Sequence, residues 1–394
     1  WKIGESPVTF QNWYGGEDFD GQKAQRLRGW DTPEADFTGW RNAVRMQPPK
    51  GKLSAKEFLP IRIWEHWTAE SVKELPNGNW LGGMGKNSAG FVRLRLWNTG
   101  KYEGRKVEMY PAEVLKADGS GVDQASCTQS CDTLWQCAVK DSYIIAGTGT
   151  EEWHPSFCYH GFQYVEVAGF PGIPTVRNFE GCAVRLMNEK HSDFETDNEI
   201  LNQINRITDR SIESNMMCSF TDCPQIEKLG WLETTQLMFS SVAAGYDIRS
   251  WIPKIMGDMR DAQVRPEDAE GVFMEADSRK YPGFAFDKFE NRETEEPGFV
   301  PGIAPEFFRI GGLFKDPNWG GACVMTPWYY YREYGDVNIL RQNFGLMQSY
   351  VDHLERRSVN GVLKEYAQMG EWGQLNENTP TALVATCAFY QQAV

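Results

Sequence analysis

The feature that most constrains the fold is a change in hydrophobic period near residue 190. Before it, apolar and polar residues alternate in short runs, as in residues 91–97 (FVRLRLW) and 162–168 (FQYVEVA). Such alternation is typical of strands with one buried face. After it, apolar residues such as Ile200, Ile204 and Ile207 recur at helical spacing. We therefore predict β-sandwich material followed by an all-helical domain.

The helical part is predicted to contain several helices separated by loops rich in Gly and Pro. Their expected ranges are 197–208, 231–248, 250–263, 322–335, 336–357 and 379–393. Because no fixed sequence period links them, a closed α/α toroid is favoured over a solenoid. The Gly-rich run 82–87 (GGMGKN) lacks the spacing of a phosphate-binding loop and predicts a tight turn.

Composition excludes several classes of protein. A chain of 394 residues is long enough for two or three domains. The net charge of −14 gives a surface that repels phosphate backbones, so we expect no nucleic-acid partner. Its apolar stretches are short and broken by Gly or Pro, so we also expect no membrane-spanning segment.

Three of the nine cysteines, Cys127, Cys131 and Cys137, cluster in a polar stretch. A structural zinc site needs four closely spaced ligands, and this stretch has no nearby His, so a disulfide that pins a surface loop is favoured. A disulfide indicates an oxidising compartment, and we expect a secreted, extracellular protein. The odd number of cysteines leaves at least one thiol free, or paired outside this chain.

The richest segment for chemistry is 221–233 (TDCPQIEKLGWLE). Pro224 prevents a helix from running through Asp222, so we expect a helix that begins after it. Glu227 and Trp231 would then share one face of that helix, with the cation Lys228 between them. Glycoside hydrolysis uses two carboxyl groups, one of which is kept protonated by apolar or acidic neighbours. The alternative from composition alone is a solvated acidic helix start.

Several segments resemble the bacterial and fungal α-L-rhamnosidases of glycoside hydrolase family 78. Residues 221–233 are similar to the family signature Asp-Cys-Pro-His-Arg-Glu-Lys-Leu-Gly-Trp-Leu-Glu. Further similar segments lie in the same order along the chain, at residues 13–20, 29–33, 82–94, 157–167, 316–320, 331–336 and 379–386. The resemblance implies β-sandwich domains followed by an (α/α)6 barrel, with a remnant of an N-terminal sandwich at 1–50, a sandwich at 51–188 and a partial barrel at 189–394.

The resemblance also implies roles for individual residues. Glu227 matches the family's general acid in an inverting hydrolysis of terminal α-L-rhamnosyl residues. Residues that match or neighbour the family's sugar-contacting positions are Asp222, Lys228, Trp231, Glu233, Trp319 and Glu371. No residue of this chain matches the family's general base, which lies in a later barrel segment. By family proportions we expect about half of the barrel and a chain truncated at both ends, completed by a missing region or a second polypeptide.

Three departures from the family pattern leave other functions open. Ile226 replaces an Arg beside the acid, Gly321 replaces an acid that follows Trp-Gly, and Glu371 stands where many members have Asp. One alternative is a catalytically altered or inactive carbohydrate-binding or structural relative. Another is an α/α-barrel glycosidase with a different sugar specificity.

The expected partner is a rhamnose-containing carbohydrate, and the mechanism requires no cofactor. The acidic run 290–296 (ENRETEE) offers oxygen ligands for Ca²⁺. It lacks the regular spacing of a dedicated calcium loop, so a solvated charge run is the favoured interpretation. His154 and His160 flank a predicted strand start and are expected to be structural.

Overall fold

The computed structural model describes residues 1–47, 52–125, 138–265, 296–305, 315–364, 366, 370 and 379–394. The chain divides into two compact units. The first, the β unit, comprises residues 1–56, 62–185 and 223–227. The second, the helical unit, comprises residues 57–61, 186–222 and 228–394. The predicted domain limits at residues 50 and 188 stay predictions.

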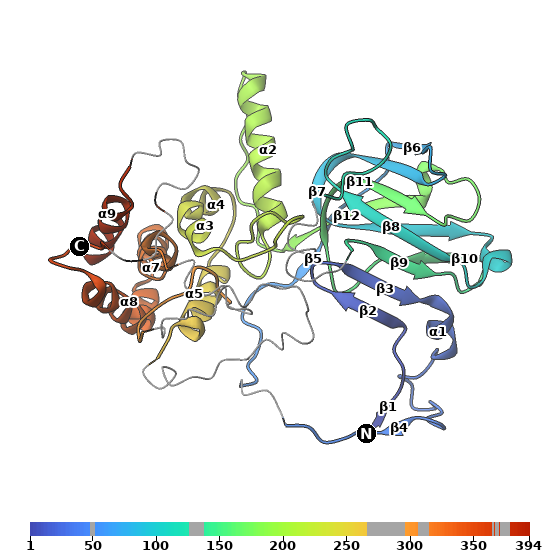
Figure 1. The fold of residues 1–394 in the computed structure, drawn as a ribbon, viewed down its shortest axis with the longest axis horizontal. Coiled ribbons are helices and arrows are strands. Elements are labelled where there is room, and N and C mark those ends of the chain that lie inside the picture. The colour runs from blue at the N-terminus through green and yellow to red at the C-terminus, as the bar shows by residue number, and fades with distance from the viewer. Residues whose placement is uncertain are drawn as a thin grey trace. The chain divides into compact units, whose positions relative to one another are not determined.

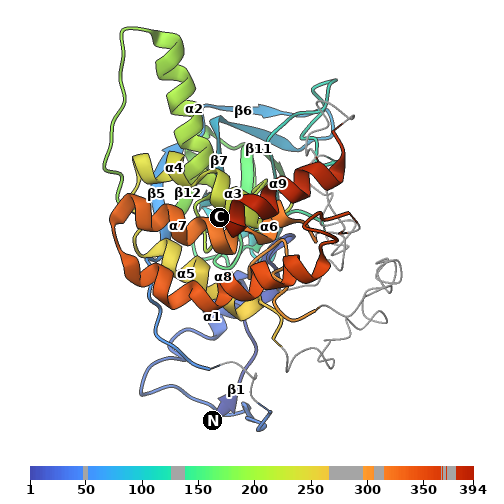
Figure 2. The same cartoon turned by 90° about the vertical axis from the view of Figure 1, so that its left-hand side faces the viewer.

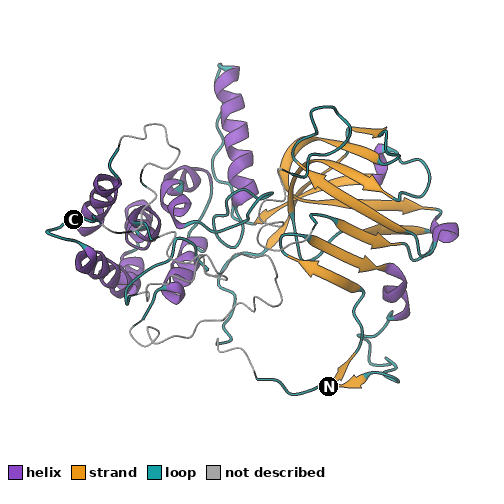
Figure 3. Cartoon of the chain, in the orientation of Figure 1, coloured by secondary structure: helices purple, strands orange, loops and turns teal. Residues whose placement is uncertain are grey.

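The described strands are short apart from one long central strand (Figures 1 and 3). They are β1 (Lys2–Ile3), β2 (Val8–Asn12), β3 (Gly16–Asp20), β4 (Arg41–Asn42), β5 (Ile61–Thr68), β6 (Ser71–Glu74), β7 (Trp80–Trp97), β8 (Lys106–Ala112), β9 (Asp141–Ile144), β10 (Thr150–Trp153), β11 (His160–Ala168) and β12 (Phe179–Leu186). Ten of these described strands form one sheet, in which β7 pairs with β6, β10, β11 and β12.

The alternation predicted for residues 91–97 is confirmed in β7. Val92, Leu94 and Leu96 are buried in the core of the β unit. Arg93 and Arg95 point to the other face and form ion pairs with the carboxylates of Glu180 and Glu152, at 2.7 and 2.8 Å. Period-two burial in this strand therefore separates an apolar face from a charged one.

The tight turn predicted at residues 82–87 is wrong, because this segment lies inside β7. Its pairing with β11 shifts between Gly83, opposite Tyr164, and Ser88, opposite Phe162. Within this irregularity Gly85 takes a φ of +79°, a conformation that glycine adopts without strain. The glycines thus build a bulge in a continuous strand rather than a chain reversal.

The helices are α1 in the β unit and α2 to α9 in the helical unit. Their bounds are α1 (Gly21–Arg26), α2 (Glu199–Asn215), α3 (Leu232–Leu237), α4 (Phe239–Gly245), α5 (Trp251–Ala262), α6 (Pro317–Gly320), α7 (Ala322–Tyr334), α8 (Val337–Arg357) and α9 (Thr381–Ala393). The helices predicted from periodicity are present, except that the range 231–248 is two helices divided at Met238.

Local sequence explains several helix ends. The Asn198 side chain accepts a hydrogen bond from Ile200 N–H at the start of α2, at 3.0 Å. Gly335, with a φ of +70°, ends α7, and Asp336 accepts a bond from Asn338 N–H to begin α8. A Gly-Asp pair between two apolar stretches therefore makes a short helix–helix connection.

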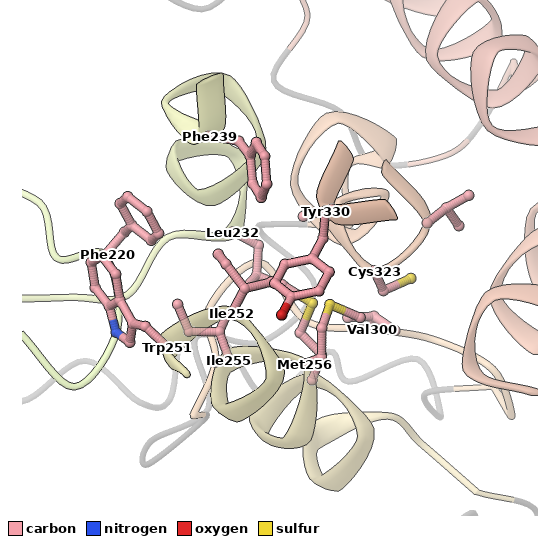
Figure 4. Packing of buried hydrophobic residues seen from close by; sticks show 14 of the residues in the cluster. Phe220, Leu232, Phe239, Trp251, Ile252, Ile255, Met256, Val300, Cys323 and Tyr330 are labelled. Atoms are coloured by element: carbon pink, nitrogen blue, oxygen red, sulfur yellow. The ribbon is translucent and has the colours of Figure 1, made fainter. Parts of the chain in front are cut away.

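The core of the helical unit lies between α5, α7 and α8, which pack side by side (Figure 2). Phe220 stacks on Trp251 with ring centroids 4.2 Å apart, and Met256 and Tyr330 belong to the same buried cluster (Figure 4). None of the described helices has the length and apolar character needed to cross a bilayer.

Four cysteines in the described part of the chain, Cys182, Cys218, Cys323 and Cys387, carry free thiols. This fits the expectation that at least one thiol stays unpaired. The predicted disulfide among Cys127, Cys131 and Cys137 lies outside the described residues.

Candidate active site

Residues 222–229 form a closed turn in which the backbone folds back on itself. Asp222 N–H donates to the Leu229 carbonyl at 2.8 Å, and the two residues form an isolated β-bridge. Inside the turn, Ile226 and Glu227 donate their N–H groups to the Cys223 carbonyl at 2.8 and 3.0 Å. These local bonds fix the backbone that carries Glu227.

The helix predicted to begin after Pro224 is therefore wrong. Cys223 and Lys228 have φ values of +45° and +52°, in the left-handed region that interrupts a right-handed helix. Glu227 and Trp231 do not share a helical face, because helix α3 begins only at Leu232. Strain at two non-glycine residues indicates that the fold, rather than local preference, holds this turn.

Trp231 and Glu233 occupy the junction between this turn and helix α3. Leu232 N–H donates to the Gly302 carbonyl at 2.9 Å, and Ala304 N–H donates to the Gly230 carbonyl at 3.1 Å. The strand-like pairing holds the backbone on both sides of Trp231. Glu233 lies in the first turn of α3, where the helix dipole favours a carboxylate.

Helix α3 packs on the short helix α6, which carries Trp319. Gln236 Nε2 donates to the Asn318 carbonyl between the two helices. Asp316 caps α6 by accepting from Asn318 N–H at 2.8 Å, and Trp319 is buried. The helical unit thus brings together the elements that carry Glu233 and Trp319.

The part of the turn that belongs to the β unit packs closely on the first residues of β11. A Cβ atom at Gly161 would lie 2.8 Å from Gln225 Cβ and 2.8 Å from Glu113 Oε1. Burial raises the pKa of Glu113, whose carboxylate accepts from Asn87 Nδ2 at 3.0 Å. Only glycine allows the backbone of residue 225 to approach β11 this closely.

The candidate residues therefore divide between the two units. Asp222, Lys228, Trp231, Glu233 and Trp319 belong to the helical unit, and Lys228 is buried.

Glu227 clusters with the β unit, and Glu371 lies outside the described residues. The predictions overlooked Gly161 and Gly230 as residues that shape the site. Neither position has room for a side chain, since a Cβ at Gly161 would lie 2.8 Å from Gln225 Cβ and a Cβ at Gly230 would lie 2.4 Å from Ser219 Oγ. Gly230 lies inside the family-like segment 221–233, whereas nothing in the residue pattern around Gly161 distinguishes it from an ordinary strand glycine.

Gly321, one of the departures from the family pattern, has no room for a side chain. A Cβ there would lie 1.8 Å from Gln392 Nε2 and 2.3 Å from the Pro317 carbonyl oxygen. Gln392 Nε2 instead donates to that carbonyl at 2.7 Å. The amide of α9 therefore occupies the space next to α6 that an acid at position 321 would need.

Comparison with known families assigns both parts of the chain. The model of the bacterial α-L-rhamnosidase six-hairpin glycosidase domain matches residues 189–394. The concanavalin-like domain of the same proteins matches residues 73–185, and the α-L-rhamnosidase N-terminal domain matches residues 1–65. The chain belongs to the bacterial α-L-rhamnosidase family, and its fold joins β domains of the concanavalin-like kind to a six-hairpin helical domain.

Individual relatives agree with this assignment. An α-L-rhamnosidase of Streptomyces avermitilis is 28% identical over 100% of this chain, and one of Formosa agariphila is 26% identical over 94% of it. Those alignments span 34% and 36% of the relatives' own lengths.

Two solved structures share the fold along the whole chain. The α-L-rhamnosidase from Dictyoglumus thermophilum superposes with a TM-score of 0.83 at 28% identity, covering 40% of that protein. The Streptomyces avermitilis enzyme complexed with L-rhamnose gives 0.82 at 26% identity, covering 34%.

Proposed function

We propose that the protein hydrolyses terminal α-L-rhamnosyl residues from glycosides or polysaccharides, with inversion at the anomeric carbon. The six-hairpin family match over residues 189–394 is the observation that carries this proposal. One related structure was solved in complex with L-rhamnose, which supports a rhamnose-containing carbohydrate as the substrate.

Glu227 is our proposed general acid, which would donate a proton to the glycosidic oxygen. Its support is the motif 221–233 and a backbone position fixed by the bonds to the Cys223 carbonyl. An inverting mechanism needs a second carboxylate, about 6.5–9.5 Å from the first, to activate water on the opposite face of the sugar. We assign that general base to no residue of this chain.

Asp222, Lys228, Trp231, Glu233, Trp319 and Glu371 are our proposed sugar-binding residues. Carboxylates and the ammonium group suit the sugar hydroxyls, while an indole suits the apolar face of the ring. The packing of α3 on α6 supports a common role for Glu233 and Trp319. We also propose a secreted protein, supported by the cysteine cluster 127–137, and recovery of the protein in the culture medium would test this.

The test is Glu227→Gln in the full-length protein, with two rhamnosides that differ in their leaving groups. A disaccharide needs protonation of its departing oxygen, whereas 4-nitrophenolate leaves with little help. We expect kcat on the disaccharide to fall by about 10²–10⁴-fold, the range of general acid catalysis, and the loss on the aryl rhamnoside to be smaller. Proton NMR should show β-L-rhamnose as the first product.

The matched control is Glu333→Gln, because Glu333 is an exposed carboxylate on α7. It should leave both rates unchanged. Near-normal turnover of the disaccharide by Glu227→Gln would refute the acid assignment. A wild-type protein that binds rhamnosides without turnover would favour the catalytically altered relative, and faster turnover of another aryl glycoside would change the sugar assignment.

A further inference from the structure

Four side chains with metal-binding atoms meet in the interior of the β unit. Glu17 in β3, Asp141 in β9, Cys158 just before β11 and His160 at the start of β11 are all buried. The first two are 124 positions apart in the sequence, so only the fold brings them together. The strands β3 and β9 lie side by side and run parallel (Figure 1). Asp18 pairs with Ser142, which sets Glu17 beside Asp141.

The distances within this cluster suit a tetrahedral metal site. His160 Nε2 lies 3.0 Å from Asp141 Oδ2, Cys158 Sγ lies 3.5 Å from Asp141 Oδ1, and Cys158 Sγ lies 3.8 Å from His160 Nε2. Bonds of about 2.0–2.3 Å at tetrahedral angles put neighbouring ligand atoms about 3.3–3.7 Å apart. One ion could therefore replace the three contacts with small movements of the side chains.

Glu17 lies beside this group of three ligand atoms, and a shift of its carboxylate toward the ion would supply the fourth ligand. Its N–H donates to Asp141 Oδ1 at 3.0 Å, and its Oε2 accepts from Ser156 and Phe157 N–H at 3.0 and 3.1 Å. These bonds hold the carboxylate between Asp141 and the segment that leads into Cys158. Among the residues that the structure describes, no hydrogen-bond donor reaches the buried Oε1 atom of Glu17.

Electrostatics also favours a cation here. Glu17 and Asp141 bring two buried carboxyl groups into the cluster. Two buried carboxyl groups and a thiol therefore share a single imidazole as their basic neighbour within the cluster. Buried charges of one sign are costly unless a partner or a metal compensates them.

We propose that Glu17, Asp141, Cys158 and His160 form a structural site for a divalent transition metal of the zinc class. Sulfur and imidazole ligands suit zinc, whereas calcium requires six to eight oxygen atoms. Binding displaces the thiol proton of Cys158 to solvent and leaves His160 neutral. The ion joins β3 and its hairpin partner β2 to β9 and β11, so it stabilises the β unit without entering the sugar chemistry.

The experiment measures metal content and ligand type in the full-length protein. Elemental analysis should give one equivalent of zinc that a chelator removes, and reloading should raise Tm by about 5–10 °C at a hundredfold excess over Kd. X-ray absorption of the zinc protein should show one sulfur neighbour at about 2.3 Å, with lighter atoms at about 2.0–2.2 Å. The cobalt-loaded protein should show a thiolate-to-metal charge-transfer band.

Cys158→Ser should abolish that band, and the matched control Cys182→Ser should keep it, because Cys182 is buried in the same unit outside the cluster. The absorption measurement on wild-type protein decides the case if the variant fails to fold. Absence of stoichiometric metal, or a site without sulfur, would overturn the proposal. Two or more sulfur neighbours would do so too, since they would assign the metal to another group of cysteines.

Discussion

At the scale of single residues, His353 shows how burial fixes a protonation state. Its ring is buried on α8, and its Nε2 lies 3.2 Å from the Tyr366 hydroxyl. Burial, with smaller effects from Arg356, Arg357 and Lys315, lowers the pKa of His353 to about 4. Nδ1 lies 3.7 Å from the Glu296 carboxylate. Because the ring is neutral at neutral pH, this contact is not an ion pair there.

This shift predicts a loss of stability in mild acid. The unfolded His353 has the ordinary pKa of 6.5, so between pH 6.5 and about 4 the unfolded state binds the extra proton. The histidine's contribution is therefore complete above pH 6.5 and falls by about 3 kcal/mol as the pH drops to 4. Urea unfolding of the wild type and of His353→Gln at several pH values measures this loss in the free energy of unfolding. Equal pH dependence in the two proteins would contradict the expected coupling.

At the scale of elements, the turn 223–227 and the start of β11 depend on one another. Gly161 contacts Gln225, and the same turn carries Glu227. The turn has two residues with positive φ at or beside its ends, so its conformation depends on such packing rather than on helix propensity. The strand β11 is therefore expected to position the candidate acid through the turn.

The variant Gly161→Ala tests this dependence. Its added methyl must displace Gln225 or Glu113, at an expected cost of about 1–3 kcal/mol. Because small displacements of a reacting group are costly, kcat on the disaccharide should fall about tenfold or more with a smaller change in KM. Gly100→Ala is the control, since a Cβ atom at Gly100 would have its nearest neighbour, the Gly147 carbonyl oxygen, 3.8 Å away. A variant that loses stability but keeps wild-type kcat would show that β11 does not position Glu227.

At the scale of the whole molecule, two hydrophobic cores lie in different units. One includes Leu94 and Val165 of the β unit, and the other includes Trp251 and Leu354 of the helical unit. Each core is built from residues of its own unit. Unfolding is therefore expected to proceed in two transitions.

Two core substitutions separate those transitions. Leu94→Ala should destabilise the β unit, and Leu354→Ala should destabilise the helical unit. Each substitution is expected to lower the unit's free energy of unfolding by about 3 kcal/mol and its Tm by about 6–12 °C. Both leucines are fully or almost fully buried, so the two truncations are matched. Differential scanning calorimetry distinguishes the transitions, and the expectation fails if either variant shifts both equally.

Sequence by itself determined the division into strands and helices and most of the helix positions, because the hydrophobic period reports which face is buried. It also determined the family, through motifs that occur in the same order along the chain. It failed at residues 82–87 and 223–231, where pairing with β11 and positive φ values override local preference.

Tertiary structure alone decided which distant residues meet. It placed Glu17 beside Asp141 and packed Gln225 against Gly161. It also filled the space beside Gly321 with the side chain of Gln392. These contacts join residues far apart in the chain, and no periodic pattern encodes them. The sequence thus identified the chemical groups of segment 221–233, whereas the packing around the segment determined its closed turn.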